Sequence, residues 1–162
     1  MHHVSVNHKI NAPAAKVWEV LDKFSEIYKY HPFVKHSENL NQQDSGLGAE
    51  RSCHFEDGNI IKERIIAYEK DKSYHVEIYD PGNFPLHKAI ALLDVKPEGK
   101  NISIVTFNMS FQPKYGPAGW LMAKMMTKKQ FASILKKVLQ GLDTHLQTGG
   151  IIGKNEMVRK AA

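Results

Sequence analysis

Cysteine is almost absent from this chain of 162 residues, which contains Cys53 alone. A single cysteine excludes an internal disulfide and is typical of a protein that folds in a reducing compartment. Long apolar runs are also missing: no stretch approaches the roughly 20 residues of a membrane-spanning helix, and the N-terminus lacks the apolar core of a signal peptide. We therefore expect no membrane span and a cytoplasmic location.

Metal-binding patterns are missing as well. The chain has nine histidines, but no two of them have the spacing and the neighbouring carboxylates of a metal site. We therefore expect no metal and no other cofactor. Acidic residues are fewer than basic ones, 17 against 22, and the net charge is +5. The lysines are not interleaved with aromatic residues and match no nucleic-acid-binding motif, so we expect no nucleic-acid partner.

The composition, 42% hydrophobic and 24% charged, is that of one ordinary globular domain. Its longest pattern predicts a helix over residues 117–148, in which Pro117 suits the first turn and Gly149-Gly150 ends the last. The apolar residues recur at alternating steps of four and three, as on one side of a helix, with Lys128 in the one missing place: Leu121, Met125, Ala132, Leu135, Leu139, Leu142 and Leu146. The first half is rich in methionine. It either packs as ordinary core or covers a ligand cavity.

Seven segments have the alternation of β-strands: residues 3–10, 34–41, 49–55, 60–68, 74–79, 86–95 and 102–111. Between the first two, Asn11-Ala12-Pro13 opens a short helix, and a second short helix over residues 25–30 ends at His31-Pro32. The connections between the later strands are short, with turns expected at Asp57-Gly58 and at Pro97-Glu98-Gly99.

Short strands with tight connections favour an antiparallel sheet. We therefore predict an α+β fold in one domain, residues 1–148. A curved seven-stranded antiparallel sheet wraps around the long helix, and the two short helices close one end. Residues 149–162 form a basic C-terminal tail. A curved sheet and a straight helix do not fill the space between them, so a cavity is expected there.

Two charged residues are predicted to face this cavity. In the strand over residues 49–55, Arg51 and Cys53 share one side, while the other side is polar and should face water. By the same argument Glu63 points inward in the next strand, and the Asp57-Gly58 turn brings both residues onto the same concave face of adjacent strands, with the register between the strands left open. One alternative is a structural ion pair, in which each buried charge only compensates the other. The other is a site that binds and polarises a ligand oxygen, with Glu63 moving a proton.

Several short motifs resemble the polyketide cyclase/dehydrase group of the START-like (SRPBCC) superfamily, which also holds the birch-pollen-allergen proteins. The N-terminal ones are Asn11-Ala12-Pro13, Val17-Trp18-Glu19-Val20-Leu21, Phe24 and Lys29-Tyr30-His31-Pro32. The later ones are Gly48-Ala49-Glu50-Arg51, Asp57-Gly58, Glu63-Arg64, Phe84-Pro85-Leu86 and Phe111-Gln112-Pro113. The resemblance covers residues 3–148 and implies a helix-grip fold with a hydrophobic cavity.

The resemblance also bears on Arg51 and Glu63. They match an arginine and a glutamate that lachrymatory factor synthase, a member of the superfamily, uses for its rearrangement. Glu63 also lies where the abscisic-acid receptors carry a glutamate that contacts hormone through water. The gate and latch sequences of those receptors are absent here. Arg51 and Glu63 are therefore the candidate catalytic residues.

The candidate ligand-binding residues are apolar or aromatic side chains expected near the open end of the cavity, with His87 at its mouth: Tyr30, Phe33, Phe55, Tyr74, Phe84, His87, Phe107, Met109, Trp120, Met122, Met125 and Met126. Such a lining suits a polyketide, a lipid or an isoprenoid. Our first prediction is therefore that the protein binds a small hydrophobic molecule. The alternatives are a cofactor-independent cyclase, dehydratase or isomerase that uses Glu63 and Arg51, and a module that binds ubiquinone or a ribosome.

Overall fold

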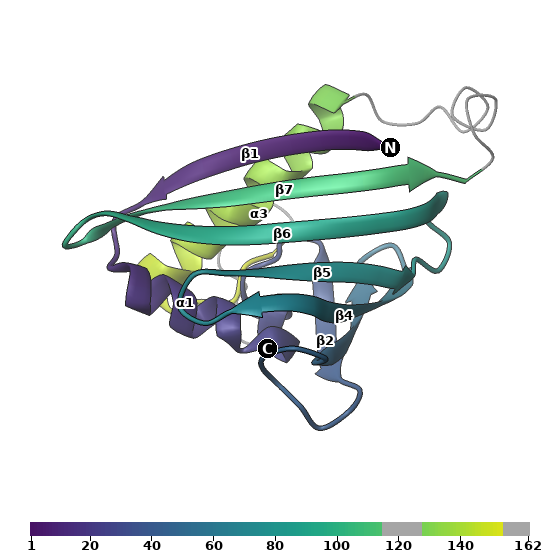
Figure 1. Ribbon diagram of the computed structural model, residues 1–162, viewed down its shortest axis with the longest axis horizontal. Coiled ribbons are helices and arrows are strands. Elements are labelled where there is room, and N and C mark those ends of the chain that lie inside the picture. The colour runs from purple at the N-terminus through teal and green to yellow at the C-terminus, as the bar shows by residue number, and fades with distance from the viewer. Residues whose placement is uncertain (115–127, 154–162) are drawn as a thin grey trace.

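The computed structural model describes residues 1–114 and 128–153. The strands in this part of the chain are β1 (His2–Ile10), β2 (Val34–Asn39), β3 (Glu50–Phe55), β4 (Ile60–Glu69), β5 (Ser73–Asp80), β6 (Leu86–Gly99) and β7 (Ile102–Pro113). The helices are α1 (Ala14–Asp22), the 3-10 helix η1 (Phe24–Lys29) and the long α3 (Lys128–Thr148) (Figure 1).

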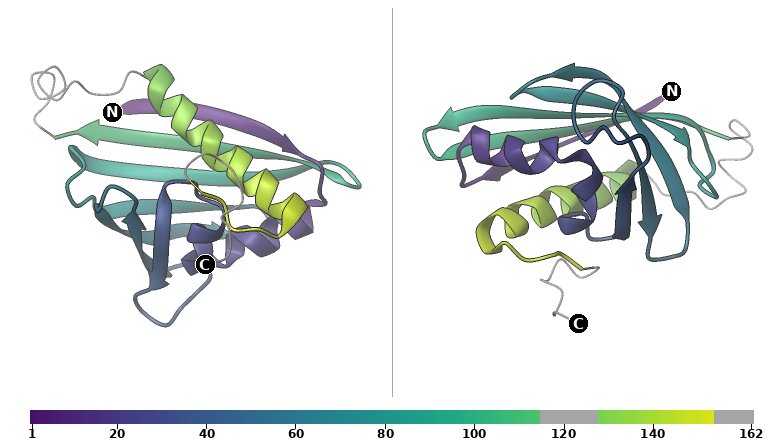
Figure 2. Two further views of the ribbon diagram at one scale, coloured as in Figure 1. Left: turned by 180° about the vertical axis from the view of Figure 1, so that it is seen from behind. Right: turned by 90° about the horizontal axis from the view of Figure 1, so that it is seen from below.

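The strands form one antiparallel sheet in the order β1-β7-β6-β5-β4-β3-β2. Each strand pairs with its neighbour in sequence except β1, which lies at the far edge and pairs with β7. The sheet is curved, and its concave side faces α3 and the two short helices (Figure 2). The predicted curved sheet around a long helix, with short helices at one end, is therefore confirmed.

The long helix α3 lies across the concave side of the sheet, behind β1, β7 and β6 in Figure 1. Leu135, Val138, Leu139 and Leu142 are buried in one core with the inward residues of the strands. The predicted apolar stripe is confirmed for the part of the helix within Lys128–Thr148. The first part of the predicted helix, residues 117–127, lies outside the described residues.

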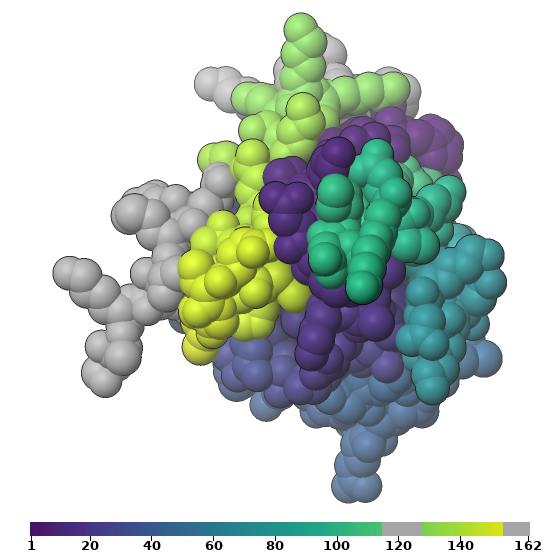
Figure 3. All heavy atoms as spheres, turned by 90° about the vertical axis from the view of Figure 1, so that its left-hand side faces the viewer, coloured from purple at the N-terminus to yellow at the C-terminus, as the bar shows by residue number. Residues whose placement is uncertain are grey.

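The short helices depend on this core for their stability. A nine-residue helix such as α1 is too short to be stable alone, and it buries Val17, Trp18 and Leu21 beneath the sheet. Figure 3 shows α1 beside the C-terminal part of α3. The helix α1 therefore covers one end of the space between the sheet and α3.

The turn expected at Pro97-Glu98-Gly99 is instead part of β6, which runs on to Gly99 and pairs Pro97 with Ser103 of β7. Proline has no backbone N–H to donate, so a strand tolerates it where no neighbouring strand requires that hydrogen bond. The pairing of β5 with β6 ends at Asp94, so the far side of Pro97 faces no strand.

The helix α3 approaches the backbone of the segment after η1 closely at Gly141. A Cβ atom added there would overlap the carbonyl oxygen of Tyr30 and touch the ring of Pro32. Glycine therefore lets α3 press directly on the backbone of residues 30–32. This contact fixes the segment that follows η1, and that segment forms part of the cavity wall described below.

We expect Gly141→Ala to lower the free energy of unfolding by about 1–3 kcal/mol, because the added methyl group forces the Tyr30 backbone away from α3. Alanine is the better helix former by about 1 kcal/mol, so a loss of stability would identify the steric contact. Urea denaturation measures the change. Ser133→Ala, on the exposed side of the same helix, is the control and should not lower stability. Equal stability of Gly141→Ala and the wild type would contradict the close approach.

Candidate functional site

A cavity of about 500 Å³ lies between the concave side of the sheet and α3. Its wall is built from η1 and the segment after it, from inward residues of β3 to β7, and from one side of α3. Most of these side chains are apolar, such as Ile61, Val76, Leu93 and Phe131. The volume falls within the roughly 300–1,000 Å³ of small-molecule sites in proteins.

Half of the twelve residues predicted to bind a ligand line this cavity, namely Tyr30, Phe33, Phe55, Phe84, Phe107 and Met109. Arg51 and Glu63 line it too. Four more predicted residues lie outside the described part of the chain: Trp120, Met122, Met125 and Met126. The placement of the described residues agrees with the prediction except at His87 and Tyr74, and their role in binding stays a prediction.

His87 does not face the cavity mouth but is exposed. The prediction assumed unbroken alternation along β6, which would put His87 on the same side as Ala89. The pairing with β7 instead shifts between Leu86 and Lys88, so one residue of β6 is extra at this point. Leu86 lines the cavity in place of His87.

Tyr74 points inward as predicted, but it belongs to the core under the short helices. Its ring lies 5.9 Å from the ring of Trp18 and 6.0 Å from that of Phe24, measured between centroids. Tyr74 is the second residue of β5, at the end of the sheet that α1 covers. An inward direction therefore does not by itself place a residue in the cavity.

Arg51 and Glu63 are directly opposite each other on β3 and β4. Arg51 Nε donates to Glu63 Oε2 at 2.6 Å, and the two side chains are only 4% and 8% exposed. Arg51 Nη1 donates to the carbonyl oxygen of Phe24 at 2.7 Å, and the guanidinium lies 3.8 Å above the Phe24 ring. The Sγ of Cys53 donates to Glu63 Oε2 at 3.5 Å. The pair is therefore tight, and η1 holds it from one side.

Two polar atoms of the pair remain unbonded. In the described part of the chain, Arg51 Nη2 and Glu63 Oε1 have no hydrogen-bond partner. Neither atom is sealed inside the protein, since the enclosed side-chain atoms that lack a partner among the described residues are Trp18 Nε1 and Tyr74 Oη. Because Arg51 and Glu63 line the cavity, they present one hydrogen-bond donor and one acceptor to it.

The electrostatics of the site agree with this geometry. Burial is the largest single influence and lowers the pKa of Arg51. The charge of Glu63, together with smaller contributions from Cys53, Tyr30 and Tyr74, outweighs burial, so the pKa is raised. Burial, followed by the charge of Glu63, raises the pKa of the Cys53 thiol. Cys53 therefore stays protonated and is not a nucleophile at neutral pH.

His31 also lines the cavity, although the sequence indicated only that it ends a short helix. Its ring meets the rings of Phe33 and Phe55 edge to face, with centroids 6.0 and 5.8 Å away. Burial and, to a smaller extent, the charge of Arg51 lower the pKa of His31 to about 3. The ring is therefore neutral at physiological pH. Its position between two predicted lining residues, Tyr30 and Phe33, was the signal in the sequence.

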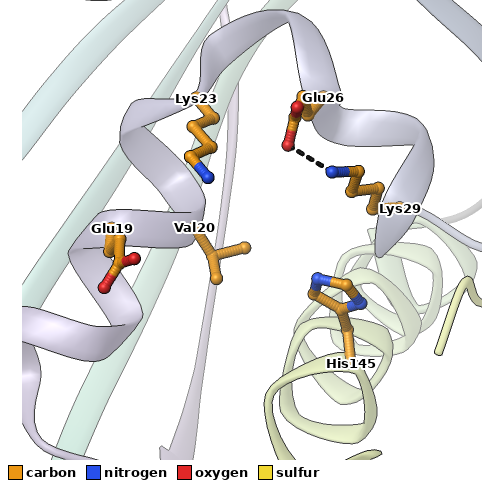
Figure 4. Close-up of a pocket in the computed structure, with 6 residues that line it drawn as sticks. All are labelled: Glu19, Val20, Lys23, Glu26, Lys29 and His145. Carbon is orange, nitrogen blue, oxygen red and sulfur yellow. Dashed lines mark hydrogen bonds and ion pairs between the residues drawn. The ribbon is translucent and has the colours of Figure 1, made fainter. Parts of the chain in front are cut away.

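A second, much smaller pocket of about 90 Å³ lies between α1, η1 and the C-terminal part of α3 (Figure 4). Its charges are mixed, and Lys29 Nζ is paired with Glu26 Oε2 at 2.6 Å. His145 faces it from α3, and its Nδ1 bonds with the carbonyl oxygen of Gly150 at 2.7 Å. This pocket is too small for an organic ligand of ordinary size.

No group of three or more histidine, cysteine, aspartate or glutamate side chains in the described part of the chain could hold a metal ion. None of the described helices combines the length and apolar character needed to cross a membrane.

The fold is similar to solved structures of low sequence identity. The protein XoxI from Bacillus cereus has a TM-score of 0.74 and 19% identity, over 91% of this chain and 97% of that one. Major latex-like protein 151 from Panax ginseng has a TM-score of 0.70 and 13% identity, over 89% and 96% of the two chains. Truncated norcoclaurine synthase from Thalictrum flavum has a TM-score of 0.62 and 17% identity, over 85% and 90%. At such identities the similarity shows the fold alone.

Comparison with curated protein sequences found no match. A family profile described as "Polyketide cyclase / dehydrase and lipid transport" matches residues 1–147, which is nearly the whole chain. This match agrees with the resemblance seen in the short motifs. The chain therefore belongs to the polyketide cyclase/dehydrase and lipid transport family.

Proposed function

We propose that the protein binds a small, mainly apolar molecule in the cavity between the sheet and α3. The observation that carries this proposal is the wall of the cavity, which is apolar except for a few groups that include the buried pair Arg51–Glu63. An apolar wall favours a ligand that leaves water, and a few fixed polar groups orient it. A cytoplasmic location remains a prediction from the sequence.

The family and the structural relatives support binding as the common property. The family description names both a cyclase or dehydrase activity and lipid transport, and each of these requires an apolar molecule to be held inside the protein. Norcoclaurine synthase is named for an activity, whereas major latex-like protein 151 is not. We therefore assign binding first and treat catalysis as a second candidate.

Filling the cavity should abolish binding without unfolding the protein. Ala91 is a small residue of β6 that lines the cavity, between Val76 and Met109 on the neighbouring strands. We expect a dye that fluoresces in apolar surroundings to bind the native wild type, and Ala91→Trp to weaken that binding at least about tenfold, because the indole occupies the space of the ligand. Fluorescence titration measures the affinity.

The control for this substitution is Ile90→Trp. Ile90 is the preceding residue of β6, so its side chain points to the opposite, convex side of the sheet. The control should keep the affinity of the wild type for the dye. If Ala91→Trp folds and binds the dye as tightly as Ile90→Trp, the dye occupies another surface and the proposed cavity site is wrong.

The second candidate is an enzyme that works without a cofactor. The observation in its favour is the unbonded Glu63 Oε1, which is able to accept a proton from a ligand hydroxyl or an activated C–H group. The tight bond from Arg51 to Oε2 opposes it, because a proton transferred to the carboxylate would remove the charge that pairs with Arg51. Turnover of a bound compound that Glu63→Gln removes, with binding retained, would favour the enzyme.

A further inference from the structure

The polar groups of the cavity wall determine which mainly apolar molecules the cavity accepts. His31 is one of these polar groups, in addition to the ion pair Arg51–Glu63. The backbone N–H of Phe33 donates to His31 Nδ1 at 3.3 Å. Because Nδ1 accepts a hydrogen bond, the proton of the neutral ring lies on Nε2. In the described part of the chain Nε2 has no partner, and it is not among the enclosed unbonded atoms. His31 therefore offers a fixed N–H donor.

The ring of His31 is held rather than free to turn. Phe33 and Phe55 pack against it edge to face, and the Phe33 N–H anchors one nitrogen. A donor held in this way loses little entropy when it bonds a ligand. Since burial and Arg51 keep the ring neutral, the donor is present throughout the physiological pH range.

The wall of the cavity thus includes two donors and one acceptor. The donors are His31 Nε2 and Arg51 Nη2, and the acceptor is Glu63 Oε1. A carbonyl oxygen accepts from donors of this kind, and a hydroxyl group donates to such an acceptor.

The charges of the wall disfavour an anion. The positive charge of Arg51 is already matched by Glu63 at 2.6 Å, and His31 adds none. The carboxylate of Asp57 belongs to the same wall. A ligand carboxylate would lie beside Glu63 without a free cation among the described lining residues, and burying such a charge is costly.

We propose that the cavity accepts an uncharged, mainly apolar molecule that carries a carbonyl oxygen and a hydroxyl group, and that His31 selects the carbonyl. The proposal rests on the proposed function and narrows it to one class of ligand, hydroxy-ketones and hydroxy-esters of low polarity. Free fatty acids, which have the same apolar part, are excluded from this class.

Competition against the bound dye tests the proposal with three ten-carbon probes: 1-hydroxydecan-2-one, decan-2-one and decanoate, at about pH 7.5. Each net hydrogen bond in a protein is worth about 0.5–1.5 kcal/mol, or roughly two- to tenfold in affinity. We expect the hydroxy-ketone to bind two- to tenfold more tightly than the ketone, and decanoate to bind more weakly than both. Decanoate binding as tightly as the hydroxy-ketone would overturn the proposal.

Variants of His31 test its role. We expect His31→Phe to weaken the binding of both ketones about two- to tenfold, because the substitution keeps an aromatic ring and removes the hydrogen-bond donor. For this comparison the dye is an uncharged hydrocarbon fluorophore without a carbonyl group, and its affinity should stay within about twofold of the wild type. His31→Gln, which has an N–H near the position of Nε2, should recover part of the loss. An equal loss for the dye and the ketones would mean that His31 only maintains the shape of the wall.

The outcomes separate this proposal from the proposed function. If Ala91→Trp blocks the dye but the three probes bind equally or not at all, the cavity binds apolar molecules and the chemical class proposed here is wrong. If Ala91→Trp leaves the dye unaffected, the cavity site itself is wrong. Should His31→Phe fail to fold, the comparison of the three probes on the wild type still decides the matter.

Discussion

Replacing Glu63 with glutamine is expected to lower the free energy of unfolding by about 3–5 kcal/mol. The substitution keeps the shape of the side chain and removes its charge, so the buried guanidinium of Arg51 loses its counter-ion. The remaining partners of Arg51, the Phe24 carbonyl and ring, do not replace a carboxylate. Urea denaturation followed by circular dichroism measures the loss.

The matched control is Glu77→Gln, which removes one carboxylate from an ion pair at the surface. Glu77 Oε2 lies 3.3 Å from Arg64 Nη2, and these side chains are 28% and 43% exposed. Exposed pairs contribute about 0–1 kcal/mol, so the control should change stability little. If Glu63→Gln is no less stable than Glu77→Gln, the tight buried pair does not contribute to stability as described here.

A large loss is also expected for Leu139→Ala, about 2–5 kcal/mol. Leu139 lies in the middle of α3 and is fully buried, with an exposed fraction of 0%. Truncation removes its apolar contacts with the sheet and leaves a cavity that the curved sheet cannot close. The urea midpoint of the variant measures this effect.

Gln140→Ala is the control for this substitution, because Gln140 is the next residue of the same helix and is exposed. Exposed substitutions of this kind change stability by less than about 0.5 kcal/mol. Equal stability of the two variants would mean that α3 does not pack on the sheet through Leu139. It would also mean that α3 does not enclose the cavity as described above.

The common face of Arg51 and Glu63 on adjacent strands was predictable because local rules determine it, whereas their direct pairing is a finding of the structure. Strand alternation assigns each residue to a side of the sheet, and the tight turn at Asp57-Gly58 fixes which residues of β3 and β4 lie opposite each other. Gly58 has a φ of 87°, a conformation that favours glycine, so the turn is specified by sequence. What the sequence left open was the pair's geometry, which depends on contacts from Phe24 in a distant element.

Other residues of the site were not predictable from alternation. The pairing of β6 with β7 shifts at His87, and no pattern in the sequence predicts this shift. The shift turns the side chain of His87 toward water. Tyr74 points inward, but the packing of α1 decides that it is covered by helix rather than by cavity. His31 lies between η1 and β2, where no period applies. Its place in the wall depends on the contact between Gly141 and the Tyr30 backbone.

Native mass spectrometry of the protein purified gently from its own organism, beside Ala91→Trp prepared in the same way, tests most directly whether the cavity is a ligand site. We expect the wild type to carry a small apolar molecule as an added mass, and the variant, whose cavity is filled, to lack it. Identical spectra from the two proteins, with or without an added mass, would contradict ligand binding in this cavity.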